Sequence, residues 1–346
     1  MIEVENLVKK YGSHIAVNQL TFQVKKGQIY GFLGPNGAGK STTMNIMTGY
    51  LAATEGKVRI NGYDMLTQSE KAKKSIGYLP EVPPLYQEMM VDEYLGFAAE
   101  LKKIPKKERK QQIAEVLELT KTEEVSKRLI HNLSKGYKQR VGIAQAILGY
   151  PEVIILDEPT VGLDPKQIIE IRDLIRYLAG KHTVILSSHI LSEVSAVCDQ
   201  IMIMSKGKLV VSDSPKGLQE TMGSKAELKL SVLAVQEETE KVLQTISSQK
   251  EVHLSYTQEA DVLNILIRFS TESGRGDEIS REVGRLLAQN QIPVISMCCE
   301  EKSLEDIYLS LMSCDSDTNA SAREQQAVQP QLSDQEQKEN DDESHS

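Results

Sequence analysis

The chain has 346 residues, a length that predicts roughly two domains, and its composition, 40% hydrophobic and 26% charged, is ordinary for a soluble globular protein. Its formal net charge of −9 is concentrated near the C-terminus: residues 313–346 hold nine acidic and two basic residues, which leaves −2 for residues 1–312. This nearly neutral body argues against a nucleic-acid-binding surface, so no nucleic-acid partner is expected.

The chain carries no recognisable targeting or membrane-spanning segment. Its N-terminus lacks a basic stretch followed by an apolar one, so no signal peptide is expected. Apolar runs such as Val153–Leu156 are far shorter than the ~20 residues that span a bilayer. The cysteines show no CxxC spacing, which indicates neither a metal site nor a disulfide framework. We therefore expect a cytoplasmic protein in which any membrane span belongs to a partner.

Residues 1–220 alternate short β-branched runs with helical stretches, as in an α/β domain with a mainly parallel sheet. Each predicted buried strand is a short apolar run bounded by turn or polar residues. These strands are Ile29–Leu33, Val153–Leu156, Thr183–Ser187 and Gln200–Met204. Hairpin-like alternation in Ile2–Leu7 and Ile15–Val24 predicts a further antiparallel β layer.

Within this domain, residues 82–150 are predicted to form an inserted helical subdomain. Val91–Lys103 places apolar residues at helical spacing, and Pro105 can occupy the first turn of a helix over Lys106–Leu119. The basic stretch Lys102–Lys110 is interpreted as a solvated face.

Residues 221–312 predict a smaller accessory unit with the order strand, helix, strand, strand, helix, strand. Its predicted elements are Ala226–Leu233, Glu237–Ser247, Val252–Tyr256, Val262–Phe269, Asp277–Gln289 and Val294–Met297. This order is consistent with a ferredoxin-like α+β domain, and it carries no catalytic constellation. Leu304–Met312 is predicted as a final helix, and residues 313–346 as a disordered acidic tail.

One segment matches the phosphate-binding pattern GxxxxGK[ST] in full. Its residues are Gly34, Pro35, Asn36, Gly37, Ala38, Gly39, Lys40 and Ser41, and Thr42 continues into a predicted helix. Because an apolar strand leads in, backbone N–H groups and the helix N-terminus are expected to face an anion. Lys40 is predicted to reach the β- and γ-phosphates of ATP, and the Ser41 hydroxyl to ligate Mg²⁺. This pattern alone does not separate ATPases from GTPases or kinases.

A second segment narrows the class. Val153–Leu156 is an apolar strand that ends in Asp157 and Glu158. A strand buried on both faces delivers such carboxylates to the edge of the sheet where ligands bind. Asp157 is therefore predicted in the Mg²⁺ shell, and Glu158 as the general base that polarises the attacking water.

Further segments, read together with the phosphate loop, resemble motifs of the ABC ATPase family. Leu133–Arg140 is similar to the signature LSGGQ, with Lys135 replacing the first glycine and Tyr137 replacing the glutamine. Asp157–Thr160 and Gly162–Pro165 resemble the extended Walker B motif and the D-loop. The resemblance spans residues 1 to about 220, roughly two-thirds of the chain.

Two single residues extend this resemblance. His189 follows a predicted strand and matches the switch histidine of the family. Tyr11 lies where the family places an aromatic ring that stacks on adenine. The other histidines match no motif and are expected at surface or capping positions; they are His14, His131, His182, His253 and His345.

The resemblance implies a nucleotide site shared between two ATPase subunits. In the family, each ATP lies between the phosphate loop of one subunit and the signature of the other. Ser134 and Gly136 would then meet the γ-phosphate in trans, and Asp164 of the D-loop is carried over to the nucleotide site. His189 would hold the γ-phosphate and the attacking water. The partners implied are a second copy or a paired ATPase subunit, and a separate integral membrane permease.

A further departure from the family pattern lies in the loop that joins the core to the helical subdomain. Ile76–Glu81 places Glu81 where the family usually has a glutamine that senses Mg²⁺ and the membrane partner. A glutamate can still ligate Mg²⁺, and it adds a negative charge that the metal offsets. Together with the signature variant, this motif resembles the ABC-2 export-type branch, which includes drug-resistance and gliding-motility-associated exporters.

The leading hypothesis is therefore the energy-coupling ATPase of a membrane exporter, bound to the cytoplasmic face of the membrane through its permease. The alternative is a soluble ABC ATPase that acts on ribosomes or DNA. Such proteins usually carry two nucleotide domains or a long coiled-coil insertion, and this sequence shows neither. A phosphate-loop kinase is disfavoured by the signature and the switch histidine.

Overall fold

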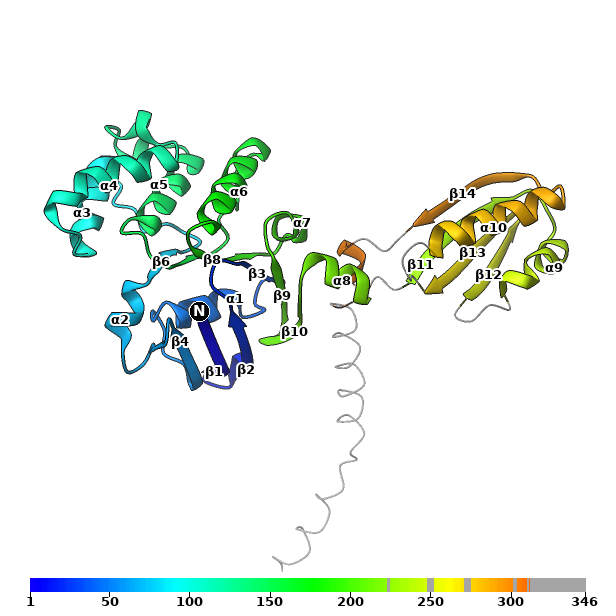
Figure 1. Cartoon of the computed structure of the whole chain (residues 1–346), viewed down its shortest axis with the longest axis horizontal. Coiled ribbons are helices and arrows are strands. Elements are labelled where there is room, and N and C mark those ends of the chain that lie inside the picture. Colours follow the sequence, from blue (N-terminus) through cyan, green and yellow to red (C-terminus); the bar gives the residue numbers. More distant parts are fainter. Residues whose placement is uncertain (223–224, 248–251, 271–274, 301–303, 310, 312–346) are drawn as a thin grey trace, which may run out of the picture. The chain divides into compact units, whose positions relative to one another are not determined.

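A computed structural model describes residues 1–222, 225–247, 252–270, 275–300, 304–309 and 311 (Figure 1). The predicted disordered tail, residues 313–346, lies outside the described residues, as does Met312 of the predicted final helix. Among the described residues, no helix combines the length and apolar character needed to cross a membrane.

The chain opens with an antiparallel sheet, as its hairpin-like alternation predicts. β1 (Ile2–Tyr11) pairs with β2 (His14–Val24) on one side and with β4 (Glu55–Ile60) on the other, and β5 (Tyr63–Asp64) extends the edge. The register places Tyr11 opposite His14 across the turn that closes the hairpin.

The second sheet is mainly parallel and has the strand order β10-β9-β3-β8-β7-β6. Its strands are β3 (Ile29–Leu33), β6 (Ile76–Leu79), β7 (Val153–Leu156), β8 (Thr183–Ser188), β9 (Gln200–Ser205) and β10 (Lys208–Asp213). β10 pairs antiparallel with β9, and the other neighbours are parallel. The central strands β3, β7 and β8 are buried throughout, which explains their unbroken apolar character in the sequence.

One hydrophobic core joins the two sheets through α1 (Lys40–Met47). It combines residues of both sheets, such as Ile2 and Phe32, with Met44 and Met47 of α1. α6 (Pro165–Ala179) and α7 (Leu191–Ser195) also contact the parallel sheet. The shorter helices α2 (Ser69–Lys74) and α8 (Pro215–Met222) complete this part of the chain.

The predicted helical subdomain is built from α3 (Val91–Leu101), α4 (Lys106–Leu119) and α5 (Lys135–Ile147), which contact one another. Two short 3₁₀ turns, Glu123–Val125 and Ile130–Asn132, lie between α4 and α5. Pro105 is the N-cap of α4 and does not occupy its first turn. α5, which begins within the signature-like segment Leu133–Arg140, also contacts β6 of the parallel sheet.

The C-terminal unit has the predicted β-α-β-β-α-β order. Its elements are β11 (Lys225–Val232), α9 (Gln236–Ser247), β12 (Val252–Glu259), β13 (Val262–Ser270), α10 (Arg275–Gln289) and β14 (Val294–Glu300). The antiparallel strand order β12-β13-β11-β14 confirms the ferredoxin-like prediction. α9 and α10 share a separate hydrophobic core with this sheet, and residues 304–309 are helical.

Candidate nucleotide-binding site

The phosphate loop connects β3 to α1, as predicted, and two of its glycines permit backbone packing that no side chain allows. Gly39 is the N-cap of α1 with φ 101°, a left-handed conformation that favours glycine. A Cβ on Gly34 would lie 2.4 Å from the Met204 carbonyl oxygen of β9. The loop therefore lies directly against the sheet, with the α1 N-terminus at its end.

Lys40 is buried, and its ammonium is held at the loop by several acceptors. Nζ donates to the carbonyl oxygens of Gly34 at 2.7 Å and Pro35 at 3.3 Å. It also lies 3.6 Å from Oε1 of Glu158, which is equally buried. The cation predicted to bind phosphate is thus fixed between the loop and the predicted general base.

An oxygen-rich pair lies where the predicted Mg²⁺ ligands meet. The Ser41 hydroxyl donates to Asp157 Oδ1 at 3.2 Å, which joins α1 to the end of β7. The Ser187 hydroxyl of β8 also donates to Asp157 Oδ1 and accepts the backbone N–H of Glu158 at 2.9 Å. Hydroxyl and carboxylate oxygens are hard ligands that suit Mg²⁺, which is commonly bound by one or two carboxylates and completes its shell with water and phosphate. The donor set therefore fits this ion.

Glu158 adopts a left-handed backbone conformation, with φ 48°. A non-glycine residue in this region is strained, and such strain clusters at functional sites. Its side chain lies between two partners from different elements: Lys40 on one side and His189 on the other, where His189 Nδ1 is 3.1 Å from Glu158 Oε2. The structure thus brings together the predicted base and the predicted switch histidine.

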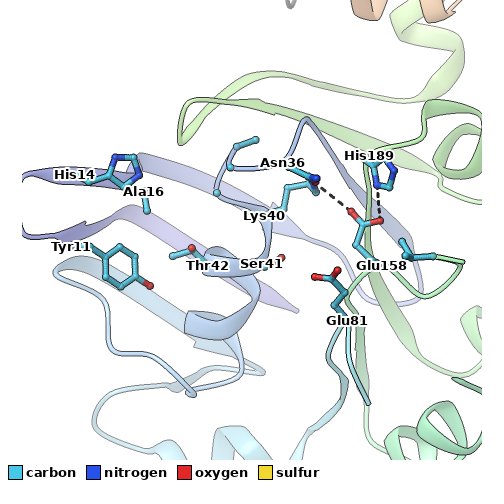
Figure 2. Close-up of a pocket in the computed structure, with 14 residues that line it drawn as sticks. Tyr11, His14, Ala16, Asn36, Lys40, Ser41, Thr42, Glu81, Glu158 and His189 are labelled. Atoms are coloured by element: carbon cyan, nitrogen blue, oxygen red, sulfur yellow. Dashed lines mark hydrogen bonds and ion pairs between the residues drawn. The ribbon is translucent and has the colours of Figure 1, made fainter. Parts of the chain in front are cut away.

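These residues line one cleft of about 450 Å³, within the ~300–1,000 Å³ typical of small-molecule sites (Figure 2). Its lining residues are Tyr11, His14, Ala16, Asn36, Gly37, Ala38, Gly39, Lys40, Ser41, Thr42, Glu81, Glu158, Val161 and His189. Gly34 and Pro35 adjoin it through their contacts with Lys40, and Asp157 lies behind Ser41.

Three lining residues were not predicted: His14, Ala16 and Val161. His14 is exposed, as expected, but it faces the cleft together with Tyr11 because the two residues pair across the hairpin turn. His14 could have been predicted in the cleft from the hairpin, because pairing of its strands places His14 opposite Tyr11. Ser187 was also missed, because a serine inside an apolar strand carries no motif of its own.

Glu81 follows β6 and lines the cleft, with its carboxylate on the side of Ser41 and Glu158 (Figure 2). β6, which precedes Glu81, is hydrogen-bonded to the helix that follows the phosphate loop: the Tyr78 hydroxyl donates to Asn45 Oδ1 of α1 at 3.0 Å. Burial, and then the charge of Asp157, raise the pKa of Tyr78, so its phenol stays protonated as a donor near neutral pH. The departure from the family pattern therefore places a second carboxylate beside Glu158 in the cleft.

The signature residues lie outside the lining of this cleft. Ser134 is the N-cap of α5, and its hydroxyl accepts the backbone N–H of Tyr137 at 3.4 Å. Gly136 lines a different pocket and packs closely on Gln167 of α6, whose Oε1 would lie 2.4 Å from a Cβ on that glycine. Asp164 caps α6 by accepting the N–H of Gln167 at 2.9 Å. Within this chain, Ser134, Gly136 and Asp164 are thus not brought to the phosphate loop.

The phosphate loop, the acidic end of β7 and the histidine after β8 define a P-loop nucleoside triphosphatase of the ATP-binding-cassette type. Residues 17–161 match the ABC transporter family. The chain is 36% identical over 314 residues to the bacitracin transport ATP-binding protein BcrA of Bacillus licheniformis, covering 90% of this chain and 97% of that protein. It is 31% identical to the linearmycin resistance ATP-binding protein LnrL of Bacillus subtilis, covering 90% and 98%.

Solved structures show the same fold. An ATP-binding subunit of an ABC transporter matches with a TM-score of 0.60 and 30% identity, over 64% of this chain and 93% of that one. The dimeric cassette MJ0796 in a post-hydrolysis state, bound to ADP and Pi, matches with a TM-score of 0.57 and 25% identity, over 62% and 98%.

This chain therefore belongs to the ABC transporter ATP-binding proteins. It binds and hydrolyses ATP and energises transport as one subunit of an ABC transporter, as the motifs predicted. The alternative of a ribosome- or DNA-directed ATPase is not supported by these relatives.

Proposed function

We propose that this chain binds Mg-ATP at a site completed by a second ATPase subunit, and that it powers export through a separate integral membrane permease. This proposal rests on one observation: the residues predicted to bind ATP lie in two separate places on the chain. The cleft holds the phosphate loop, Glu81, Glu158 and His189, whereas Ser134 and Gly136 lie outside its lining. A second copy of this chain would supply them in trans, as the dimeric state of the related cassette MJ0796 supports.

In this proposal Ser41, Asp157 and Glu81 hold Mg²⁺, which neutralises charge on the phosphates when bound. Lys40 binds the β- and γ-phosphates, and the α1 N-terminus directs backbone N–H groups at them. Glu158 accepts a proton from the attacking water, and His189 positions that water and the γ-phosphate from the other side of Glu158. Tyr11 stacks on the adenine at the hairpin end of the cleft.

We assign residues 1–220 to the ATP-binding domain, 82–150 to its helical subdomain, and 221–312 to an accessory domain. Separate hydrophobic cores in the first and last of these regions support the division.

The segment that follows Glu81 supports a docking role toward the permease. Val82 is 78% exposed and Tyr86 54% exposed, although both are large apolar residues. Tyr86 packs against Tyr94 and Phe97 of α3, so a contact made here reaches the helical subdomain. A permease bound at this surface would hold the chain at the cytoplasmic face of the membrane and would respond to changes at Glu81.

The relatives named for bacitracin transport and linearmycin resistance support antibiotic-type compounds as the exported class. Co-purification of this chain from detergent-solubilised membranes with a multi-span protein tests the permease part of the proposal. Recovery with ribosomes or DNA in place of a membrane protein would contradict it.

Ser134→Arg tests the shared site directly. We expect the monomer to bind ATP with nearly unchanged affinity, since Ser134 lies outside its own cleft, while turnover is abolished. Nucleotide binding is measured by titration calorimetry and turnover by phosphate release. Equal loss of binding and turnover would show that the site is not divided between subunits.

A further inference from the structure

The charges of the cleft do not balance within one subunit. The Lys40 ammonium is matched by Glu158 at 3.6 Å, and Glu81 adds a further carboxylate to the lining. Mg²⁺ would offset only part of the charge of ATP, and Asp157 adds a further carboxylate beside Ser41, so the cleft still gains from a cation supplied by another element.

Lys135 is an exposed cation on the signature segment, where the family pattern has a glycine. It is the first residue of α5, and the first turn of that helix holds no acidic residue. A lysine at this end is unfavourable with respect to the helix dipole, which attracts anions and repels cations. The helix thus gains nothing locally from this charge.

The Lys135 side chain is directed to the loop between Glu158 and α6. A Cβ on Gly162 would lie only 2.1 Å from Lys135 Nζ, so the ammonium rests directly over that glycine. Gly162 has φ 72°, and the preceding residue, Val161, lines the ATP cleft. Lys135 itself is not in the lining of its own cleft. Its charge is therefore presented on the surface that carries Ser134, next to the D-loop.

We infer that Lys135 is a cation that the signature contributes in trans to the nucleotide site, where it offsets Glu81 and the γ-phosphate of ATP bound to the other subunit. This inference rests on the shared site of the proposed function. The departures at Glu81 and Lys135 are then complementary, because Glu81 adds a negative charge on the phosphate-loop side and Lys135 a positive charge on the signature side. Lys135 is a specificity residue for the triphosphate state, since ADP lacks the γ-phosphate.

A double-mutant cycle in a Glu158→Gln background, which slows hydrolysis, tests this pairing. ATP-driven dimerisation is measured by sedimentation for the parent, Lys135→Met, Glu81→Gln and the double variant. We expect Lys135→Met to weaken the dimer about tenfold and Glu81→Gln to restore most of that loss. Lys135→Arg should remain close to the parent. Lys138→Met, in the same helical turn, is the matched control and should leave dimerisation unchanged.

Folding of each variant is verified by an unchanged circular-dichroism spectrum and an unchanged midpoint of thermal unfolding. An unaltered dimer affinity in Lys135→Met, or purely additive effects of the two substitutions, would overturn the inference. A parent that stays monomeric with ATP while binding it normally would instead overturn the shared site itself, so the two failures are distinguishable.

Discussion

His189 Nδ1 lies 3.1 Å from Glu158 Oε2, at the point where the ends of β7 and β8 meet in the ATP cleft. The opposite oxygen of the same carboxylate lies 3.6 Å from the Lys40 ammonium. A buried carboxylate held from both sides has a fixed orientation, so one position in the cleft is favoured for the water whose proton it accepts. The pair thereby joins the phosphate-binding loop to the residue that follows β8.

Glu158→Gln is expected to lower turnover about 10²- to 10⁴-fold, because the amide keeps the size of the side chain but cannot accept the proton of the attacking water. ATP binding should be retained, since the loop and Lys40 are unchanged. Phosphate release measures the first effect, and titration calorimetry the second.

Glu193 provides the matched control for this substitution. It is also a buried glutamate, but it accepts hydrogen bonds from Thr160 and Ser188 and does not line the cleft. Glu193→Gln should leave turnover within a few-fold of the wild type. A comparable loss in both variants would mean that turnover follows the stability of this region and that Glu158 is not the base.

His189→Ala is expected to lower turnover by a similar order and to be strongly non-additive with Glu158→Gln. Two residues that act as one unit on the same water lose their joint contribution once either is removed. The phosphate-release rate of the double variant should therefore be close to that of the worse single variant. A double variant whose loss equals the product of the single losses would show that the 3.1 Å contact has no role in turnover.

The strands that carry the site were predictable because a strand that is buried on both faces is a continuous run of apolar residues in the sequence. Ile29–Leu33 and Val153–Leu156 are observed with the predicted bounds, and the residues that follow them form the cleft. β6, Ile76–Leu79, was not predicted as a strand, because its alternation with glycine and tyrosine is weak. β6 nevertheless positions Glu81, which follows it. The motif Ile76–Glu81 therefore identified Glu81 as a site residue although the strand that leads to it was not predicted.

The remaining parts of the site depend on packing between distant segments. Ser187 reaches Asp157 only because β8 and β7 are neighbours in the sheet, an order that no local pattern specifies. Likewise, Val161 enters the cleft because the chain turns after the strained Glu158. Motifs located the residues that are predicted to contact phosphate, whereas the strand order in the sheet determines which side chains hold those residues in place.

Ser187→Ala is expected to raise the Mg²⁺ concentration needed for half-maximal turnover about tenfold, because the hydroxyl orients Asp157 without itself facing the cleft. A Mg²⁺ titration of ATPase activity at saturating ATP measures the change. Ser188→Ala is the neighbouring control, since that hydroxyl donates to Glu193. Equal Mg²⁺ requirements in the two variants would remove Ser187 from the support of the metal site.

A partly buried lysine, Lys102, lies at the C-terminal end of α5, so the interpretation of Lys102–Lys110 as a solvated face is wrong at this residue. Lys102 Nζ donates to the carbonyl oxygens of Gln145, Ala146 and Leu148, at 2.8, 3.0 and 2.7 Å. The last carbonyls of a helix lack partners within the helix, so this ammonium satisfies groups at the end of α5 that would otherwise be unpaired. Burial lowers the pKa of Lys102 to about 8, from an ordinary value of 10.5.

Lys102→Met is expected to lower the free energy of unfolding by about 2–4 kcal/mol at pH 7, because it leaves three carbonyls without a donor. Between about pH 8 and 10.5 the unfolded chain binds more protons at Lys102 than the folded one. The stability advantage of the wild type over the variant should therefore increase with pH across that window and be constant below it. Urea unfolding of both proteins at pH 7, 8 and 9.5 measures this difference. An advantage that stays flat to pH 9.5 would show that the three carbonyls hold the ammonium charged and outweigh its burial.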